Sequence, residues 1–182
     1  MAITAYDDSA ALADFTTDPG VKENSRIIGV ALIKRGFDIT VLDDDETNWD
    51  TGITAKDIVI INPVTGNFPE ATENSVPGIG RTQTEFSNKT YNVPFRHKGV
   101  DVNLAFYNKL LKSKEYGIGF MFHDNKMYIP AGKDLEVATI DFFCRIVSEE
   151  DLEGDRYMMV SARWNSADFP YSIAAPKELF PL

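Results

Sequence analysis

The residue types that carry out acid–base or nucleophilic chemistry are sparse in this chain. It contains two histidines, His97 and His123, and one cysteine, Cys144. A catalytic or metal site needs several such groups converging at a defined spacing, and the sequence has no Gly-x-Ser-x-Gly, His-Glu-x-x-His or Cys/His cluster. We therefore expect solvated histidines at breaks and turns, a buried inert thiol without a disulfide partner, no metal, no cofactor and no enzymatic activity.

Two segments resemble ligand-binding loops but do not complete them. The segment 77–81, Pro-Gly-Ile-Gly-Arg, lacks the third glycine and the Lys-Ser/Thr of phosphate-binding loops, and it leads into a strand. Asp43, Asp45 and Thr47 match the start of a calcium loop, but glycine is missing at its sixth position and glutamate at its twelfth. We interpret the first segment as a flexible lead-in and the second as a solvated acidic loop, and the acidic turn at 148–155 as a solvated hairpin.

Length and composition place these residues in a single domain, 1–182. The chain has 182 residues, of which 43% are hydrophobic and 25% charged, so it can bury a core and is not mainly disordered. No apolar run approaches the about 18 residues of a membrane span, and the N-terminus lacks the features of a secretory signal. We expect a soluble protein made in the cytoplasm that does not associate with a membrane.

The net charge of −10 argues against a protein that grips nucleic acid, because affinity for phosphates comes from Lys and Arg. The same charge suits a surface past which DNA moves without adhering, although an acidic balance is also ordinary for soluble bacterial proteins. We therefore expect no specific nucleic-acid binding, with DNA passage as an open option.

The pattern of apolar residues predicts a mainly β (α+β) fold. Alternating or apolar runs predict strands at Arg26–Ile33, 37–42, 56–63, 82–95, 135–147 and 156–164, and a hairpin over 117–129 that turns at Asp124-Asn125. One helix is expected from Asp101 to Ser113, with Asp101 as its N-cap and a core side made of Val102, Leu104, Phe106, Tyr107, Leu110 and Leu111. About seven strands with one helix between them predict an antiparallel β-sandwich or small barrel with one flanking helix.

Three segments have no evident packing partner in this scheme. We expect an N-terminal arm or lead-in at 1–25, a long extended Pro/Gly loop at 64–81, and an apolar C-terminal arm at 172–182. A connection as long as 64–81 without regular structure is uncommon inside a compact domain, and it predicts a functional or partner-ordered loop.

In the order of these parts the chain resembles the structural proteins of tailed-bacteriophage virions, specifically the tail-tube type. The matching parts are the strand Arg26–Ile33, the loop Val64–Arg81, the helix Asp101–Ser113, and the paired strands Leu135–Val147 and Arg156–Trp164. The resemblance implies a virion protein that forms a homo-oligomer, as hexameric rings stacked into a tube, with other virion proteins as partners.

Candidate residues follow from this resemblance. For the assembly interface we select residues of the loop and of the C-terminal arm: Phe68, Val76, Ile79, Arg81, Leu179, Phe180 and Leu182. For an acidic lumen or an exposed rim we select Asp43, Asp44, Asp45, Glu149, Glu150 and Asp151.

Other interpretations stay open at this point. The chain could decorate a capsid, or serve as a head-fibre or neck/connector protein. It could also be a carbohydrate- or protein-binding β-sandwich module, with a stacking platform made of Tyr91, Tyr128, Tyr157 and Trp164.

Overall fold

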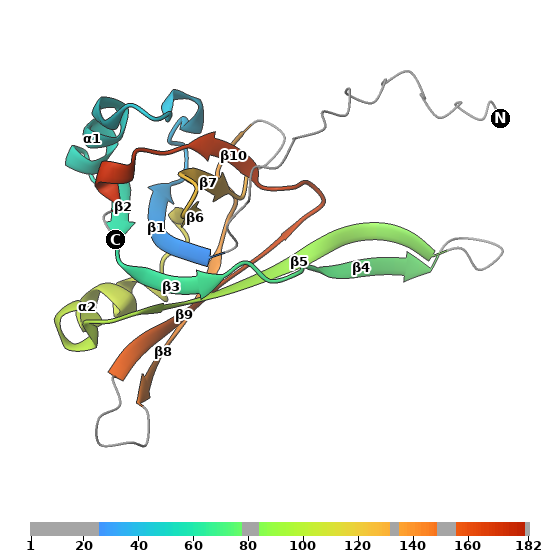
Figure 1. The fold of residues 1–182 in the computed structure, drawn as a ribbon. Coiled ribbons are helices and arrows are strands. Elements are labelled where there is room, and N and C mark those ends of the chain that lie inside the picture. Colours follow the sequence, from blue (N-terminus) through green and yellow to red (C-terminus); the bar gives the residue numbers. More distant parts are fainter. Residues whose placement is uncertain (1–25, 78–83, 132–134, 149–155, 181–182) are drawn as a thin grey trace.

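The protein is organised around one continuous antiparallel sheet. The computed structural model describes residues 26–77, 84–131, 135–148 and 156–180 (Figure 1). Its 10 strands run in the order β10-β7-β6-β1-β3-β5-β9-β8, with β2 beside β1 and β4 beside β5. This confirms the mainly β fold, but the sheet is open, so the closed-barrel alternative is wrong.

The strands and helices have the following bounds. The strands are β1 (Arg26–Lys34), β2 (Ile58–Ile61), β3 (Val64–Asn67), β4 (Thr72–Pro77), β5 (Thr84–His97), β6 (Tyr116–Phe122), β7 (Lys126–Ile129), β8 (Asp141–Ser148), β9 (Arg156–Ser166) and β10 (Tyr171–Ala174). The helices are α1 (Glu46–Thr54) and α2 (Val100–Leu110), with short 3-10 turns at η1 (Ile39–Val41) and η2 (Lys177–Leu179).

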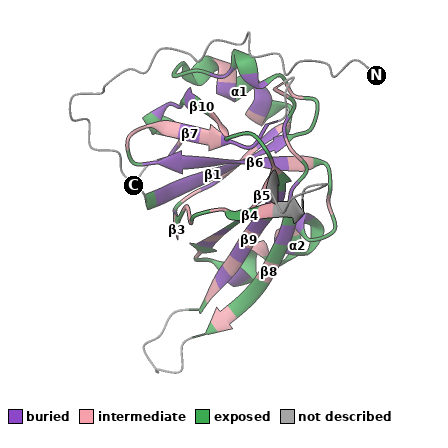
Figure 2. Ribbon diagram, turned by 90° about the vertical axis from the view of Figure 1, so that its right-hand side faces the viewer, coloured by how far each residue is buried: buried purple, intermediate pink, exposed green. Residues whose placement is uncertain are grey.

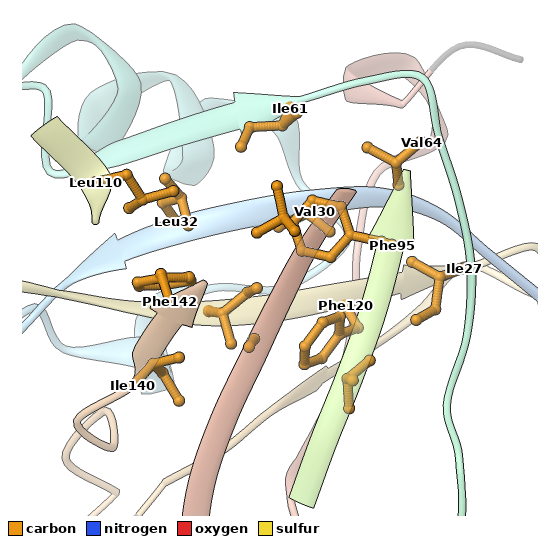
Figure 3. Close-up of a cluster of buried hydrophobic side chains, with 14 of the residues drawn as sticks. Ile27, Val30, Leu32, Ile61, Val64, Phe95, Leu110, Phe120, Ile140 and Phe142 are labelled. Carbon is orange, nitrogen blue, oxygen red and sulfur yellow. The ribbon is translucent and has the colours of Figure 1, made fainter. Parts of the chain in front are cut away.

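The sheet bends so that β1 and β6 lie over β5 and β9, with the main core between them. Figure 3 shows Val30 and Leu32 of β1 and Phe120 of β6 in the same cluster as Phe95 of β5. Along β5 and β9 buried and exposed residues alternate, because one face packs on this core and the other faces solvent (Figure 2). The two-layer packing is that of a sandwich made from one folded sheet.

A second core covers the opposite face of β1. Ala31 and Ile33 pack there with Trp49 of α1 and Phe180 of the C-terminal segment. Because β1 is buried on both faces, it is a continuous apolar run, which is why its prediction as a buried strand is confirmed. The hairpin of β6 and β7 is also confirmed, with Asn125 at φ 63° in its turn.

Helix α2 confirms the predicted helix, but its cap and its buried side differ from expectation. Gly99, with φ 85°, stands at the N-cap position instead of Asp101. Val102 is 89% exposed and Leu104 is also exposed, whereas Val100, Tyr107 and Leu110 are buried. The end of the sheet covers only a narrow stripe of the helix, so half of the predicted apolar arc faces outward.

Helix α1 was not predicted. The acidic segment before it is exposed, as expected, but it caps a helix: the Asp45 carboxylate accepts a hydrogen bond from the Thr47 N–H at 2.9 Å. The Trp49 indole N–H donates to the Asp43 carbonyl at 2.8 Å. The expected strand at 37–42 is wrong, because Asp38 caps the 3-10 turn η1 there.

Two of the three expected extensions belong to the sheet. Residues 64–67 and 72–77 form β3 and β4, which both pair with β5, so the expected loop is wrong there and only the connection 68–71 lies between the two strands. The C-terminal arm is also wrong up to residue 180, because β10 pairs with β7 and the Phe180 ring is buried. Residues 1–25, 78–81 and 181–182 lie outside the described residues. No helix in the described part is long and apolar enough to span a membrane.

Candidate assembly surfaces

His97 is not solvated as expected, because it packs against Tyr107 of α2. The Tyr107 hydroxyl lies 2.8 Å from Nδ1 of His97, which is half-buried. Burial lowers the pKa of His97 and raises that of Tyr107, so both groups are favoured in their neutral forms, and the imidazole tautomer sets which of them donates. Burial also raises the pKa of Cys144 to about 11, which keeps its thiol protonated. His123 is exposed at the β6–β7 turn, and among the described residues no three His, Cys, Asp or Glu side chains gather as a metal site requires.

Strand β8 is a long free edge. It pairs with β9 from Asp141 to Ser148, and no described strand pairs with its other side. Two large apolar side chains on it are exposed, Phe143 at 55% and Ile146 at 54%. Because successive residues of a strand point to opposite faces, these two lie on opposite sides of the edge. The other end of the sheet is the four-residue β10, which offers fewer unpaired backbone groups.

The hairpin of β4 and β5 projects from the body of the molecule (Figure 1). Strand β9 ends at Ser166, opposite Lys89, so residues 84–88 of β5 pair only with β4. A polar ladder holds its base: Asn74 donates to Asn88 and Thr90, and Thr90 donates to Asn165, each at 2.8 Å. The hairpin is therefore fixed where it leaves the sheet.

Three arginines point outward together from the solvent face of the sheet. Arg96 of β5 and Arg145 of β8 both lie beside Met159 of β9, and Arg163 lies further along β9. All three are exposed. We call this surface, with Arg26 at its border, the arginine face. Arg26 and Arg96 line a shallow hollow of about 470 Å³ there, which has no acidic residue in its wall.

Among the described residues, two arginines of this face contact neutral groups. Arg96 lies over the ring of Tyr157 at 4.9 Å, and Arg26 donates to the Thr65 hydroxyl at 3.4 Å. Within the described residues none of the four arginines forms an ion pair with a carboxylate. The neighbouring Asp141 is paired with Lys114. In the described part of the chain, the face therefore presents arginines without paired carboxylates on a protein whose net charge is −10.

Negative charge gathers around α1. Residues 36–54 contain no Lys, Arg or His, and their exposed carboxylates form what we call the acidic end: Asp38, Asp43, Asp44, Asp45, Glu46 and Asp50. Hydrogen bonds from Thr40 lower the pKa of Asp38, and those from Thr47 lower that of Asp45, so both stay ionised at neutral pH.

An aromatic pocket of about 670 Å³ opens between β5, the β6–β7 hairpin and the connection that precedes β4. Five of its lining side chains are aromatic: Phe68, Tyr91, Phe122, Tyr128 and Phe169. The Lys89 ammonium lies 4.3 Å from the centroid of the Phe169 ring at its mouth. Glu70, Glu73 and Asp124 add acidic groups to the wall, so the pocket is apolar with a charged rim.

The predicted stacking platform does not form one exposed surface. Tyr91 and Trp164 are buried and stack on each other, with centroids 4.8 Å apart and ring planes 4° apart. Tyr128 lines the aromatic pocket, whereas Tyr157 lies on the outer face below Arg96.

The predicted assembly residues divide between core packing and undescribed positions. The Phe68 ring packs edge-on against Phe120 at 5.5 Å and Trp164 at 6.1 Å, and Phe180 is 2% exposed with Leu179 half-buried beside it. Each of these three side chains packs within its own subunit, and their role in assembly stays a prediction. Val76 belongs to β4. Ile79, Arg81 and Leu182, and the predicted acidic residues Glu149, Glu150 and Asp151, lie outside the described residues.

The exposed surfaces that the sequence did not predict come from β5, β8 and β9. The apolar and β-branched residues of 141–148 indicate a strand, but not that this strand lies at an edge. Comparison with protein-family models, curated proteins and solved structures finds no significant match to the chain. Its function therefore has to be inferred from these surfaces.

Proposed function

We propose that this protein is a self-assembling structural subunit of a phage virion, with the tail tube as the first candidate. The observation that carries the proposal is the free β8 edge with Phe143 and Ile146 exposed on it. An unpaired strand presents a row of N–H and C=O groups that can pair with another chain. Soluble monomers usually blunt such edges with proline or with charged residues, lysine above all; β8 contains neither proline nor lysine, and its charged residues are Asp141 and Arg145.

Burial of these two side chains by a neighbour supports association. Fully burying a Phe or Ile side chain is worth about 1.5–3 kcal/mol, and about half of each is still exposed, so each should contribute roughly 1 kcal/mol. Backbone hydrogen bonds along the eight residues of β8 would add to this. The projecting β4–β5 hairpin, whose outer side has no partner strand among the described residues, offers a second place for a neighbour.

Virion assembly in particular is favoured by the combination of parts. A two-layer antiparallel body, a helix at its side and a projecting hairpin agree with the architectural resemblance to tail-tube proteins. A head-decoration, head-fibre or neck protein could share these parts, and would remain a monomer or small oligomer until it meets a preformed shell. The acidic lumen stays a prediction: Asp43, Asp44 and Asp45 are exposed, and a lumen lined by such groups would repel DNA.

The test is direct imaging of the full-length protein by negative-stain electron microscopy, with light scattering to measure mass. We expect rings or tubes for the wild type, and mainly monomers for the F143T/I146T variant, in which polar β-branched residues preserve the strand. The control F169T makes the same kind of change at a residue that is 77% exposed away from β8. A wild-type protein that stays monomeric, or an F143T/I146T variant that assembles normally, would contradict the proposal.

The aromatic pocket favours a second candidate function, a carbohydrate- or protein-binding module. Pockets of about 300–1,000 Å³ that combine apolar walls with a few polar groups are typical ligand sites, and this one falls in that range. A glycan array probed with the wild type and with Y128A would test it. Binding that Y128A loses would favour the module, whereas absence of binding would leave the pocket as a packing feature.

A further inference from the structure

Charge is segregated between two regions of this molecule. The acidic end gathers six carboxylates around the start of α1 without a basic residue between 36 and 54. The arginine face gathers four exposed arginines: Arg96 of β5, Arg145 of β8 and Arg163 of β9 on the outer side of the sheet, and Arg26 at the start of β1, which reaches Thr65 of β3. A protein with a net charge of −10 thus retains one strongly basic surface.

The two regions lie on opposite sides of the subunit. The arginines point away from the main core, which separates β5 and β9 from β1 and β6. The acidic end belongs to α1, whose Trp49 packs on the other face of β1. Figures 1 and 2 agree on this, since α1 and the β8–β9 hairpin lie at opposite ends in both views. A single subunit therefore cannot bring its own two regions together.

We propose that the arginine face of one copy binds the acidic end of the next, so that copies associate head to tail. The inference rests on the proposed function and specifies one of its interfaces. Contacts between two different surfaces of the same chain produce rings if the rotation closes, and filaments if it does not. Arginine suits this role because its planar fork binds carboxylates through two parallel hydrogen bonds. The exposed Phe143 lies on the same outward side of β8 as Arg145, so apolar burial accompanies the ion pairs.

A charge-swap experiment on the full-length protein tests this interface. The variant R145E/R163E reverses the basic side, and D44K/D50K reverses the acidic side. Asp43 and Asp45 are left unchanged because they accept hydrogen bonds that begin α1. We expect each double variant to raise the concentration needed for assembly at least tenfold, and the combination of all four substitutions to restore assembly to within about threefold of the wild type.

A matched control separates local pairing from net charge. The variant R145E/R163E/E70K/D168K has the same net charge as the wild type and as the rescued protein, but its new lysines lie at exposed positions outside the acidic end. This control should not restore assembly. Raising salt to about 1 M, where the screening length falls to about 3 Å, should weaken wild-type assembly in the same way as the single-sided variants. Thermal unfolding of every variant establishes that it is folded.

The outcomes distinguish the interface from the proposed function. If the wild type assembles and R145E/R163E assembles equally well, the interface is refuted while the structural role stands. If R145E/R163E assembles normally but loses retention on immobilised double-stranded DNA, the arginine face binds nucleic acid, and the interface is likewise refuted. If D44K/D50K assembles normally, the acidic end is free to line a lumen, as first predicted, and the head-to-tail contact is wrong. A monomeric wild type overturns both proposals.

Discussion

Replacing Phe180 by alanine should destabilise the isolated subunit strongly. The Phe180 ring is 2% exposed, and it lies edge-on against Trp49 with ring centroids 6.2 Å apart and ring planes at 89°. It also covers Gly29 so closely that a β-carbon added to Gly29 would lie 2.2 Å from Cδ1 of Phe180. Buried Phe-to-Ala changes cost about 3–5 kcal/mol, and a site near the chain end should fall at the lower limit, about 3 kcal/mol. For a domain of this size the melting temperature should fall by about 6–12 °C.

Thermal unfolding followed by circular dichroism, at concentrations where the protein is monomeric, measures this effect. F169A is the matched control, because Phe169 is 77% exposed and its loss should change stability by less than about 0.5 kcal/mol. A second substitution checks the contact itself. G29A should cost about 1–3 kcal/mol in the wild type, through overpacking against the Phe180 ring, and much less in the F180A background.

The reasoning would be refuted if F180A melted like F169A but failed to assemble. The C-terminal segment would then act between subunits, as the sequence first indicated, and not within one. Equal costs of G29A in both backgrounds would also contradict the packing of Phe180 on β1.

Three further predictions concern other parts of the core. G117A should destabilise the fold by about 1–3 kcal/mol in chemical denaturation, because the new β-carbon would lie 2.0 Å from Cγ1 of Val137, and an unchanged midpoint would contradict this packing. Burial lowers the pKa of His97 in the folded state, so the unfolded chain binds the proton at a higher pH than the folded protein does. The free energy of unfolding should therefore fall as the pH drops below about 6.5. H97Q should flatten that dependence, and unfolding curves at several pH values will measure it. With the pKa of Cys144 raised to about 11, the thiol of the native protein at pH 8 should react with iodoacetamide about 100-fold more slowly than that of the unfolded protein. Mass spectrometry measures the two rates, and equal rates would refute the protection of the Cys144 thiol by burial.

Local patterns were sufficient for the elements whose environment is uniform along their length. The apolar run of β1 predicts a buried strand because both of its faces are covered, and Asp124-Asn125 predicts the β6–β7 turn because its backbone conformation depends on adjacent residues. Helix α2 was also recognisable from its periodicity. Its exposed Val102 and Leu104 were not, since only the extent of the sheet beside the helix decides which apolar residues are covered.

Contacts between distant segments decided the rest. Only Trp49 and Gly52 of helix α1 are buried, so its sequence shows little of the apolar periodicity that predicts a helix. The helix is stabilised by its N-cap and by packing on β1. The C-terminal segment resembled a free arm because its partner strand β7 lies about 45 residues earlier in the chain.

The candidate surfaces also arise from contacts between segments that are distant in the sequence. Arg96, Arg145 and Arg163 are scattered along the sequence, and only the pairing of β5, β9 and β8 places them on one face. Composition therefore established the acidic net charge and the small number of histidine and cysteine residues, and the pattern of apolar residues predicted the mainly β fold. The separation of its charges onto opposite sides, and the exposure of the β8 edge, arise from strand order, which depends on long-range pairing that no local stretch of residues encodes.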